Sequence, residues 1–145
     1  VRNEFDVVYD KKAGVLNAGL SANYAWNNRL NLHFNGEFNK WNVKEVEEAW
    51  HKPKWKMNVE GTFMATNHLR FRLGYLMEAG KYALVNDEKV KLPTAHNICV
   101  GADYRLLNWL NFFVNFDNIA NQKYSNWYGY TQHGFNFMGG ISMIF

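Results

Sequence analysis

The chain has 145 residues, a formal net charge of +3 and one cysteine; 17% of its residues are aromatic and only 20% are charged. This length predicts a single domain over residues 1–145, and the mild charge, without a stripe of lysine or arginine, argues against a nucleic-acid partner. The lone Cys99 excludes a disulfide framework and a cysteine-based metal site.

No stretch approaches the roughly 20 consecutive apolar residues of a membrane helix. The mean hydropathy of −0.41 is nevertheless compatible with a membrane β-barrel, because barrel strands alternate apolar and polar residues. The first residue is Val1, the sequence shows no signal peptide, and its first ten residues already resemble a strand. We therefore expect the chain to begin within a longer protein.

Apolar and polar residues alternate with a period of two through nearly the whole chain, with asparagine and glycine frequent in the polar phase. This pattern predicts eight strands. In chain order they cover residues 5–9, 16–26, 30–38, 55–65, 69–77, 98–104, 110–116 and 135–145. A helical period fits only the short segment 44–50, which lies in a connection.

The connections alternate in length. Those after the second, fourth and sixth expected strands are short, while those after the third, fifth and seventh are long and contain both prolines, Pro53 and Pro93. Short turns at one end and long loops at the other are typical of outer-membrane barrels. Aromatic residues stand at both strand ends, as in the aromatic girdles of such barrels: Tyr24, Trp26, Trp41, Trp55, Tyr104 and Trp109.

The C-terminal stretch "NFFVNFDNIANQKYSNWYGYTQHGFNFMGGISMIF" covers about a quarter of the chain and resembles the end of TonB-dependent receptors. The matching residues are Asn118, Ile119, Asn121, Lys123, Tyr124, Gly134, Phe135, Phe137, Gly139 or Gly140, Ile141 and Phe145. The resemblance implies a role in the uptake of a scarce ligand of the siderophore, cobalamin or glycan class. It also implies that Phe145 belongs to a signal read by the barrel-assembly machinery.

The expected fold is all-β: an antiparallel up-and-down transmembrane β-barrel of about eight strands. It is either a closed small barrel or the C-terminal arc of a larger one, since receptors of this kind have about 22 strands. The expected location is the cell outer membrane. Its partners would be outer-membrane lipid, the assembly machinery through the last strand, and a small-molecule ligand through the parent receptor. The receptor plug and TonB-contacting segment are not among these residues.

Two alternatives stay open. The chain could be a self-contained eight-stranded outer-membrane barrel of structural or adhesion type, or a soluble lipocalin-like barrel whose apolar phase faces inward. The charges of the polar phase would line the lumen of a membrane barrel, solvated or paired with each other: Glu37, Glu60, Arg70, Arg72, Asp103 and Arg105. Glu60 and Arg72 are expected to be diagonal neighbours across a tight turn.

The best candidates for ligand contact are the aromatic residues of the last long connection: Tyr124, Trp127, Tyr128 and Tyr130. An enzyme is not expected, because Ser21 and His33 share the inward phase without a third orienting group. The other histidines, His51, His68, His96 and His133, show no metal-ligand spacing, and no cofactor motif is present. Gly139 and Gly140 are expected to mark a bend or close packing.

Overall fold

The computed structural model describes residues 12–144 and contains strands but no helix within that range. The strands are β1 (Gly14–Trp26), β2 (Leu30–Asn42), β3 (Trp55–Met64), β4 (Leu69–Ala79), β5 (Tyr82–Val85), β6 (Glu88–Lys91), β7 (Ala95–Leu107), β8 (Leu110–Asp117), β9 (Ser125–Trp127), β10 (Tyr130–Thr131) and β11 (Asn136–Met143). The first expected strand, at residues 5–9, and the expected signal residue Phe145 lie outside the described residues. The other seven expected strands are confirmed.

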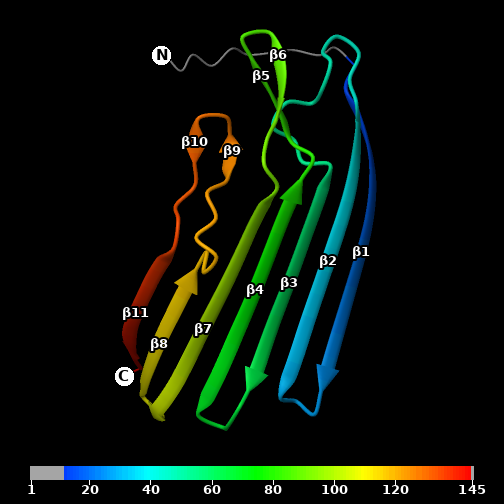
Figure 1. Ribbon diagram of the computed structural model, residues 1–145. Coiled ribbons are helices and arrows are strands. Elements are labelled where there is room, and N and C mark those ends of the chain that lie inside the picture. The colour runs from blue at the N-terminus through cyan, green and yellow to red at the C-terminus, as the bar shows by residue number, and fades with distance from the viewer. Residues whose placement is uncertain (1–11, 145) are drawn as a thin grey trace.

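Seven strands form one antiparallel sheet in the order β1-β2-β3-β4-β7-β8-β11 (Figure 1). Each strand pairs with the next long strand in the chain, which confirms the all-β, antiparallel, up-and-down arrangement. β1 and β11 are the two edges and do not pair with each other, so the described sheet is open. Neither edge strand contains a charged residue or a proline, the features that usually protect a sheet edge from further pairing.

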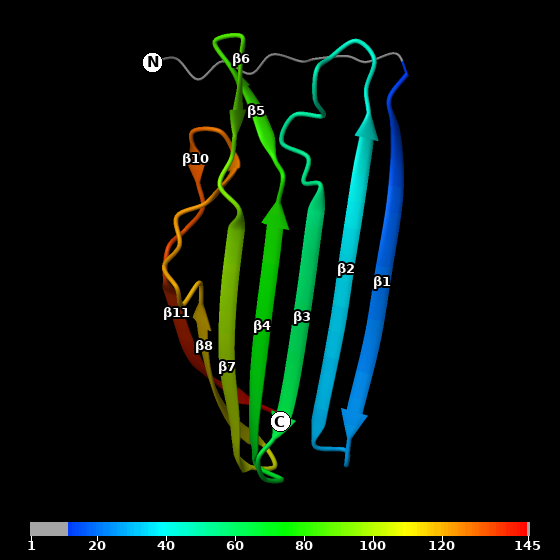
Figure 2. The same ribbon diagram turned by 45° about the vertical axis from the view of Figure 1, so that its right-hand side comes forward.

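The short turns lie together at one end of the sheet and the long connections at the other, as expected (Figure 2). Asn27 and Asn28 turn the chain from β1 into β2 with φ values of 49° and 52°, and the amide of Arg29 closes the turn on the carbonyl of Trp26 at 3.0 Å. Asparagine is one of the few residues that adopt this left-handed conformation readily. The turn therefore follows directly from its two asparagines.

The helix expected at residues 44–50 is wrong, because this segment is a series of bends. Two neighbouring carboxylates, Glu47 and Glu48, both contact the ammonium of Lys89, at 3.4 and 2.6 Å. Consecutive residues of a helix point in different directions, so a helix would separate these two carboxylates. Seven residues are also too few to stabilise an isolated helix.

The long connections contain two small hairpins that the alternation did not reveal as separate elements. β5 and β6 are joined by Asn86 and Asp87, with φ values of 50° and 63°, which is the arrangement of a two-residue hairpin turn. β9 and β10 are joined around Gly129, whose φ is 81°. Both hairpins extend beyond the long-connection end of the sheet (Figure 1).

The two faces of the sheet differ in chemistry and in shape. The apolar face carries many large side chains that are exposed, among them Leu16, Leu20, Trp26, Phe63, Phe71, Leu73, Tyr104, Phe112, Phe137 and Ile141. The polar face is hollowed by two concavities. The polar side chains that line the larger one, of about 400 Å³, include Glu60, Thr62, Arg72, Asn115 and Asp117. Those that line the smaller one, of about 250 Å³, include Asn23, Asn31, His33, Glu60 and Thr62. Residues of the apolar phase, among them Leu32, Leu73 and Val100, also line these concavities, but successive side chains of a strand point to opposite faces. The apolar side chains therefore lie on the face opposite to these polar side chains.

The described residues contain almost no conventional core. The buried hydrophobic side chains are Ala83, Leu92 and Ala95, all at the long-connection end. The sheet itself is a single layer, with no second layer against either face (Figure 2). A soluble domain normally buries the apolar side of a sheet against another layer, which the described residues do not provide.

The predicted close packing at the paired glycines is confirmed at Gly140, where the ring of Phe113 on β8 lies against the glycine backbone. A Cβ at Gly140 would lie 2.6 Å from Cζ of Phe113, whereas a Cβ at Gly19 would have its nearest neighbour at 3.7 Å. We expect Gly140→Ala to displace the Phe113 ring and lower the free energy of unfolding by about 1 kcal/mol. Gly19→Ala, measured in the same denaturant titration, should not destabilise; equal losses would contradict this packing.

Candidate functional site

The three long connections pack against one another. They are residues 43–54, the connection with the β5–β6 hairpin, and residues 118–135. The ammonium groups of Lys54 and Lys89 lie 4.9 and 4.7 Å from the centroid of the Tyr82 ring. Both lysines also contact Glu48, at 3.2 and 2.6 Å. The hydrogen bond from Lys89 lowers the pKa of Glu48, and Lys54 adds to this effect against the opposing influence of burial.

A buried lysine ties the end of β4 to the β9–β10 hairpin. The side chain of Lys81 is 1% exposed, and its ammonium donates to Glu78 Oε2 at 3.2 Å and to Asn126 Oδ1 at 3.0 Å. A buried charge is tolerated only when it is paired and hydrogen-bonded, and both conditions hold here. Lys81 therefore fixes the position of the hairpin relative to the sheet.

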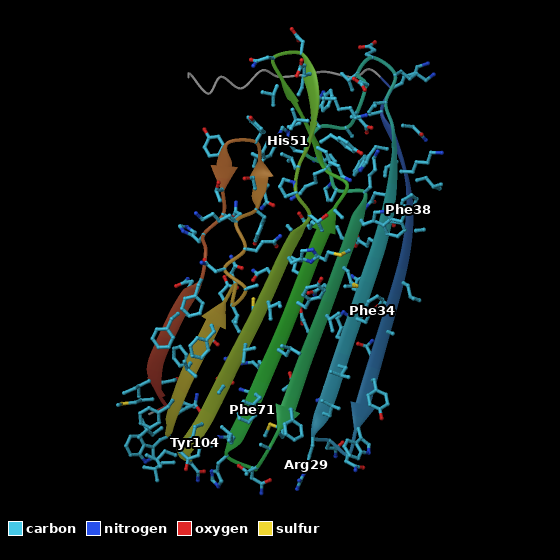
Figure 3. All side chains as sticks on the ribbon, in the orientation of Figure 1. Arg29, Phe34, Phe38, His51, Phe71 and Tyr104 are labelled. Carbon is cyan, nitrogen blue, oxygen red and sulfur yellow. The ribbon has the colours of Figure 1, made fainter. Side chains whose placement is uncertain are left out.

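His51 joins the first and last long connections. Its backbone amide donates to the carbonyl of Tyr82 at 2.7 Å, and its Nε2 accepts from the amide of Tyr128 at 3.4 Å. Its ring lies against Trp127, with centroids 4.8 Å apart. Figure 3 shows His51 among the loops, far from the short turns where Arg29 lies. The histidine thus holds the β9–β10 hairpin against residues 43–54.

Burial lowers the pKa of His51 from 6.5, and the positive charge of Lys81 lowers it further. The neutral ring is therefore favoured in the folded state, and its stabilisation is complete above the unfolded-state pKa. It is lost as pH falls from there through the lowered pKa of folded His51, because a protonated Nε2 cannot accept from Tyr128. We expect the amide resonance of Tyr128 to shift with this transition. His51→Asn, which does not titrate and tolerates the φ of 61°, should abolish the shift.

The four candidate ligand-contacting aromatics do not form one cluster. Trp127, Tyr128 and Tyr130 belong to the β9–β10 hairpin and are 52%, 51% and 45% exposed. Tyr124 precedes the hairpin and is half-buried, and its pKa is raised by burial and by the nearby negative charge of Asp117. The hairpin thus exposes three aromatic rings, while Tyr124 belongs to its base.

The base of the last long connection is organised by Asn118, whose structural role was not apparent from the sequence. Its side chain is buried, donates from Nδ2 to the carbonyls of Gln122 and His133, both at 3.0 Å, and accepts from the amide of Gln122 at 3.1 Å. Asn121 closes the same base by accepting from the amide of Phe135 at 2.9 Å. Asn118 and Asn121 therefore position the hairpin and β11 through these hydrogen bonds.

The structure brings three of the expected polar-phase charges together. Asp103 on β7 lies between Arg70 and Arg72 of β4, with its Oδ2 at 3.3 and 2.9 Å from their Nε atoms. Nη2 of Arg72 reaches Asp103 Oδ1 at 3.3 Å and continues across β7 to Asn115 Oδ1 on β8 at 2.8 Å. Gly101 permits this crossing, since a Cβ there would lie 2.7 Å from Asn115 Oδ1.

The remaining charges lie apart from this group or at its border. Arg105 follows Asp103 by two residues on the same face, and Glu37 on β2 lies opposite Lys56 on β3, near the other end of the sheet. Glu60 and Arg72 are diagonal neighbours as expected, since Glu60 lies opposite Gly74 and Arg72 opposite Thr62. The carboxylate of Glu60 accepts from Asn58 at 2.8 Å, while Arg72 binds Asp103.

Most of the residues considered for catalysis or metal binding contact separate neighbours. His33 contacts Asn23 at 2.6 Å, and Ser21 lies opposite Asn35 rather than His33. His96 contacts the hydroxyl of Tyr75 at 2.8 Å, and His68 contacts the carbonyl of Arg105 at 3.0 Å. Among residues 12–144, no group of three or more histidine, cysteine, aspartate or glutamate side chains is placed to hold a metal ion.

Within the same range, no helix is long and apolar enough to cross a membrane. No protein-family model matches the chain, and no curated protein matches it. The likeness of its C-terminal stretch to TonB-dependent receptors therefore stays a prediction from the quoted residues.

Proposed function

We propose that this chain is part of the wall of an outer-membrane transporter barrel, similar to the C-terminal strands of a TonB-dependent receptor. The observation that carries the proposal is the uncovered apolar face on the side of the sheet away from the hollow. Lipid covers such a face in a membrane barrel, while the polar face lines the lumen. A lipocalin-like barrel needs the opposite arrangement, with apolar side chains inside.

The open edges support an arc of a larger sheet over a complete small barrel. β1 exposes a 13-residue edge with no charge and no proline. An unsatisfied row of amides and carbonyls within a bilayer is very costly, so both edges require neighbouring strands. A longer barrel provides those strands on both sides.

In this role the chain supplies wall, lumen charges and one ligand-facing hairpin, and it catalyses no reaction. The three exposed rings of the β9–β10 hairpin contact the transported ligand at the long-connection end. Aromatic rings suit a glycan or a siderophore, which present flat or apolar surfaces. In the full-length protein, Trp127→Ala combined with Tyr130→Ala should weaken uptake; unchanged uptake would contradict the ligand role but not the wall.

The wall itself is tested by mixing the chain, refolded in detergent, into phosphatidylcholine vesicles with and without brominated acyl chains. Bromine quenches only tryptophans that lie within the bilayer. We expect quenching of a chain carrying only Trp26 and Trp109, on the short-turn side, and none of a chain carrying only Trp127. A chain that stays monomeric without detergent and shows no quenching would contradict membrane insertion.

A further inference from the structure

The two kinds of basic residue are segregated along the sheet. All described arginines lie in the half near the short turns: Arg29, Arg70, Arg72 and Arg105. All described lysines lie toward or within the long connections: Lys12, Lys40, Lys44, Lys52, Lys54, Lys56, Lys81, Lys89, Lys91 and Lys123. The two ends of the wall therefore present different cationic chemistry.

The two ends also differ in charge compensation. At the long-connection end, Lys54, Lys81 and Lys89 each form an ion pair with glutamate. At the other end, the arginine cluster, defined as Arg70, Arg72 and Arg105 on the polar face, shares one close carboxylate, that of Asp103. Three positive charges around one negative charge leave the cluster electropositive, and Glu60 at its border offsets this only in part.

The guanidinium groups of the cluster have hydrogen-bonding capacity left. The side chain of Arg70 is 50% exposed and contacts Asp103 through Nε alone. Arg105 is exposed, and its side chain makes no ion pair or hydrogen bond with residues 12–144. Each guanidinium has five N–H donors in a planar fork that fits a carboxylate with two parallel bonds.

We propose that the arginine cluster binds a carboxylate group from a partner that lies against the polar face. Arg72 already shows the geometry, since its Nε and Nη2 bind the two oxygens of Asp103 at 2.9 and 3.3 Å. Arg70 and Arg105 flank that pair and offer the same fork to an incoming carboxylate. The 400 Å³ hollow beside Arg72 gives the partner access to the face.

The carboxylate can come from a small molecule passing through the lumen or from an acidic side chain of a polypeptide resting on the wall. A guanidinium binds either source with two parallel hydrogen bonds, whereas an ammonium binds a carboxylate as a point charge without this forked geometry. This inference goes beyond the proposed wall function and does not depend on membrane insertion, because the polar face has the same charges in a micelle as in a bilayer.

Isothermal titration of the full chain in neutral detergent, with citrate and separately with a hexaglutamate peptide, tests the proposal. We expect Arg70→Gln combined with Arg105→Gln to weaken binding by at least about tenfold. The matched control, Lys52→Gln combined with Lys91→Gln, removes the same charge from the other end and should bind like the parent chain. Arg70→Lys with Arg105→Lys keeps the charge without the fork and should bind with intermediate affinity.

Binding of citrate alone assigns the site to a free carboxylate, and binding of the peptide alone assigns it to an acidic polypeptide. Equal weakening in the arginine and lysine double variants would show attraction by net charge only and overturn the proposal. Absence of binding by both probes to the parent chain would also overturn it. Circular dichroism of each variant establishes that the sheet is intact, and the lysine-for-arginine variant keeps the test decisive if the glutamine variant fails to fold.

Discussion

Asn118→Ala is expected to lower the free energy of unfolding by about 4 kcal/mol. The substitution removes three buried hydrogen bonds and leaves the carbonyls of Gln122 and His133 without their donor, which accounts for about 3 kcal/mol. The remaining ~1 kcal/mol comes from placing alanine at a φ of 49°. Equilibrium unfolding in urea measures the loss, and proteolysis of residues 118–135 should accelerate in parallel.

Two glycine variants separate these contributions. Asn118→Gly accepts the left-handed backbone, so it should lose only the ~3 kcal/mol of the hydrogen bonds. Asn28 has a similar φ of 52°, but its exposed side chain makes no hydrogen bond with the described residues. Asn28→Gly should therefore change stability by less than about 0.5 kcal/mol. A similar loss for both glycine variants would show that Asn118 acts only through its backbone conformation.

Leu73→Arg is expected to cost about 2–4 kcal/mol in the stability of the chain folded into vesicles, because it places a charge on the apolar face near the middle of β4. Leu73 lies opposite Gly61 and Val100 and is 50% exposed, so the arginine meets little steric obstruction. The loss is measured as the difference in urea unfolding between the variant and the parent chain in the same lipid.

The matched control is Leu84→Arg, in the β5–β6 hairpin outside the sheet, where the leucine is 44% exposed. Water is accessible there if the sheet spans the bilayer, so this change should cost less than about 1 kcal/mol. Equal costs at the two positions would mean that the apolar face is not in lipid. Such a result would contradict the proposed wall, but it would not test the proposed carboxylate site.

Local pattern was sufficient to predict the long strands, since each of them carries its own alternation and its own bounding turn residues. Residues 16–24 alternate between apolar residues and asparagine, glycine or serine, and the turn asparagines follow closely. The Asn-Asp pair at residues 86–87, between the apolar run 82–85 and the mostly charged segment 88–91, was a further signal from which the β5–β6 hairpin could have been predicted.

The alternation and the turn residues could not predict the contacts of the candidate sites. Tyr128 and His51 are 77 residues apart in the chain, and their contact depends on how two loops pack. The hydrogen bond from Arg72 to Asn115 depends on the registers of β4, β7 and β8 and on the glycine of β7 between the two side chains. Side chains could be assigned to a face by period two, but the partner of each one is decided by register and loop packing, which alternation does not encode.

The order of strands has a consequence for the rate at which the sheet forms. Every neighbouring pair in the sheet is joined by a turn or by one long connection, so pairing can proceed from hairpin to hairpin with little loop-closure entropy. The connection between β4 and β7 is one of the three long ones, and it contains the β5–β6 hairpin. A hairpin forms within about ten microseconds and brings the ends of its segment together. Pairing of β5 with β6 therefore shortens the effective loop between β4 and β7 and lowers the entropy cost of adding β7 to the sheet.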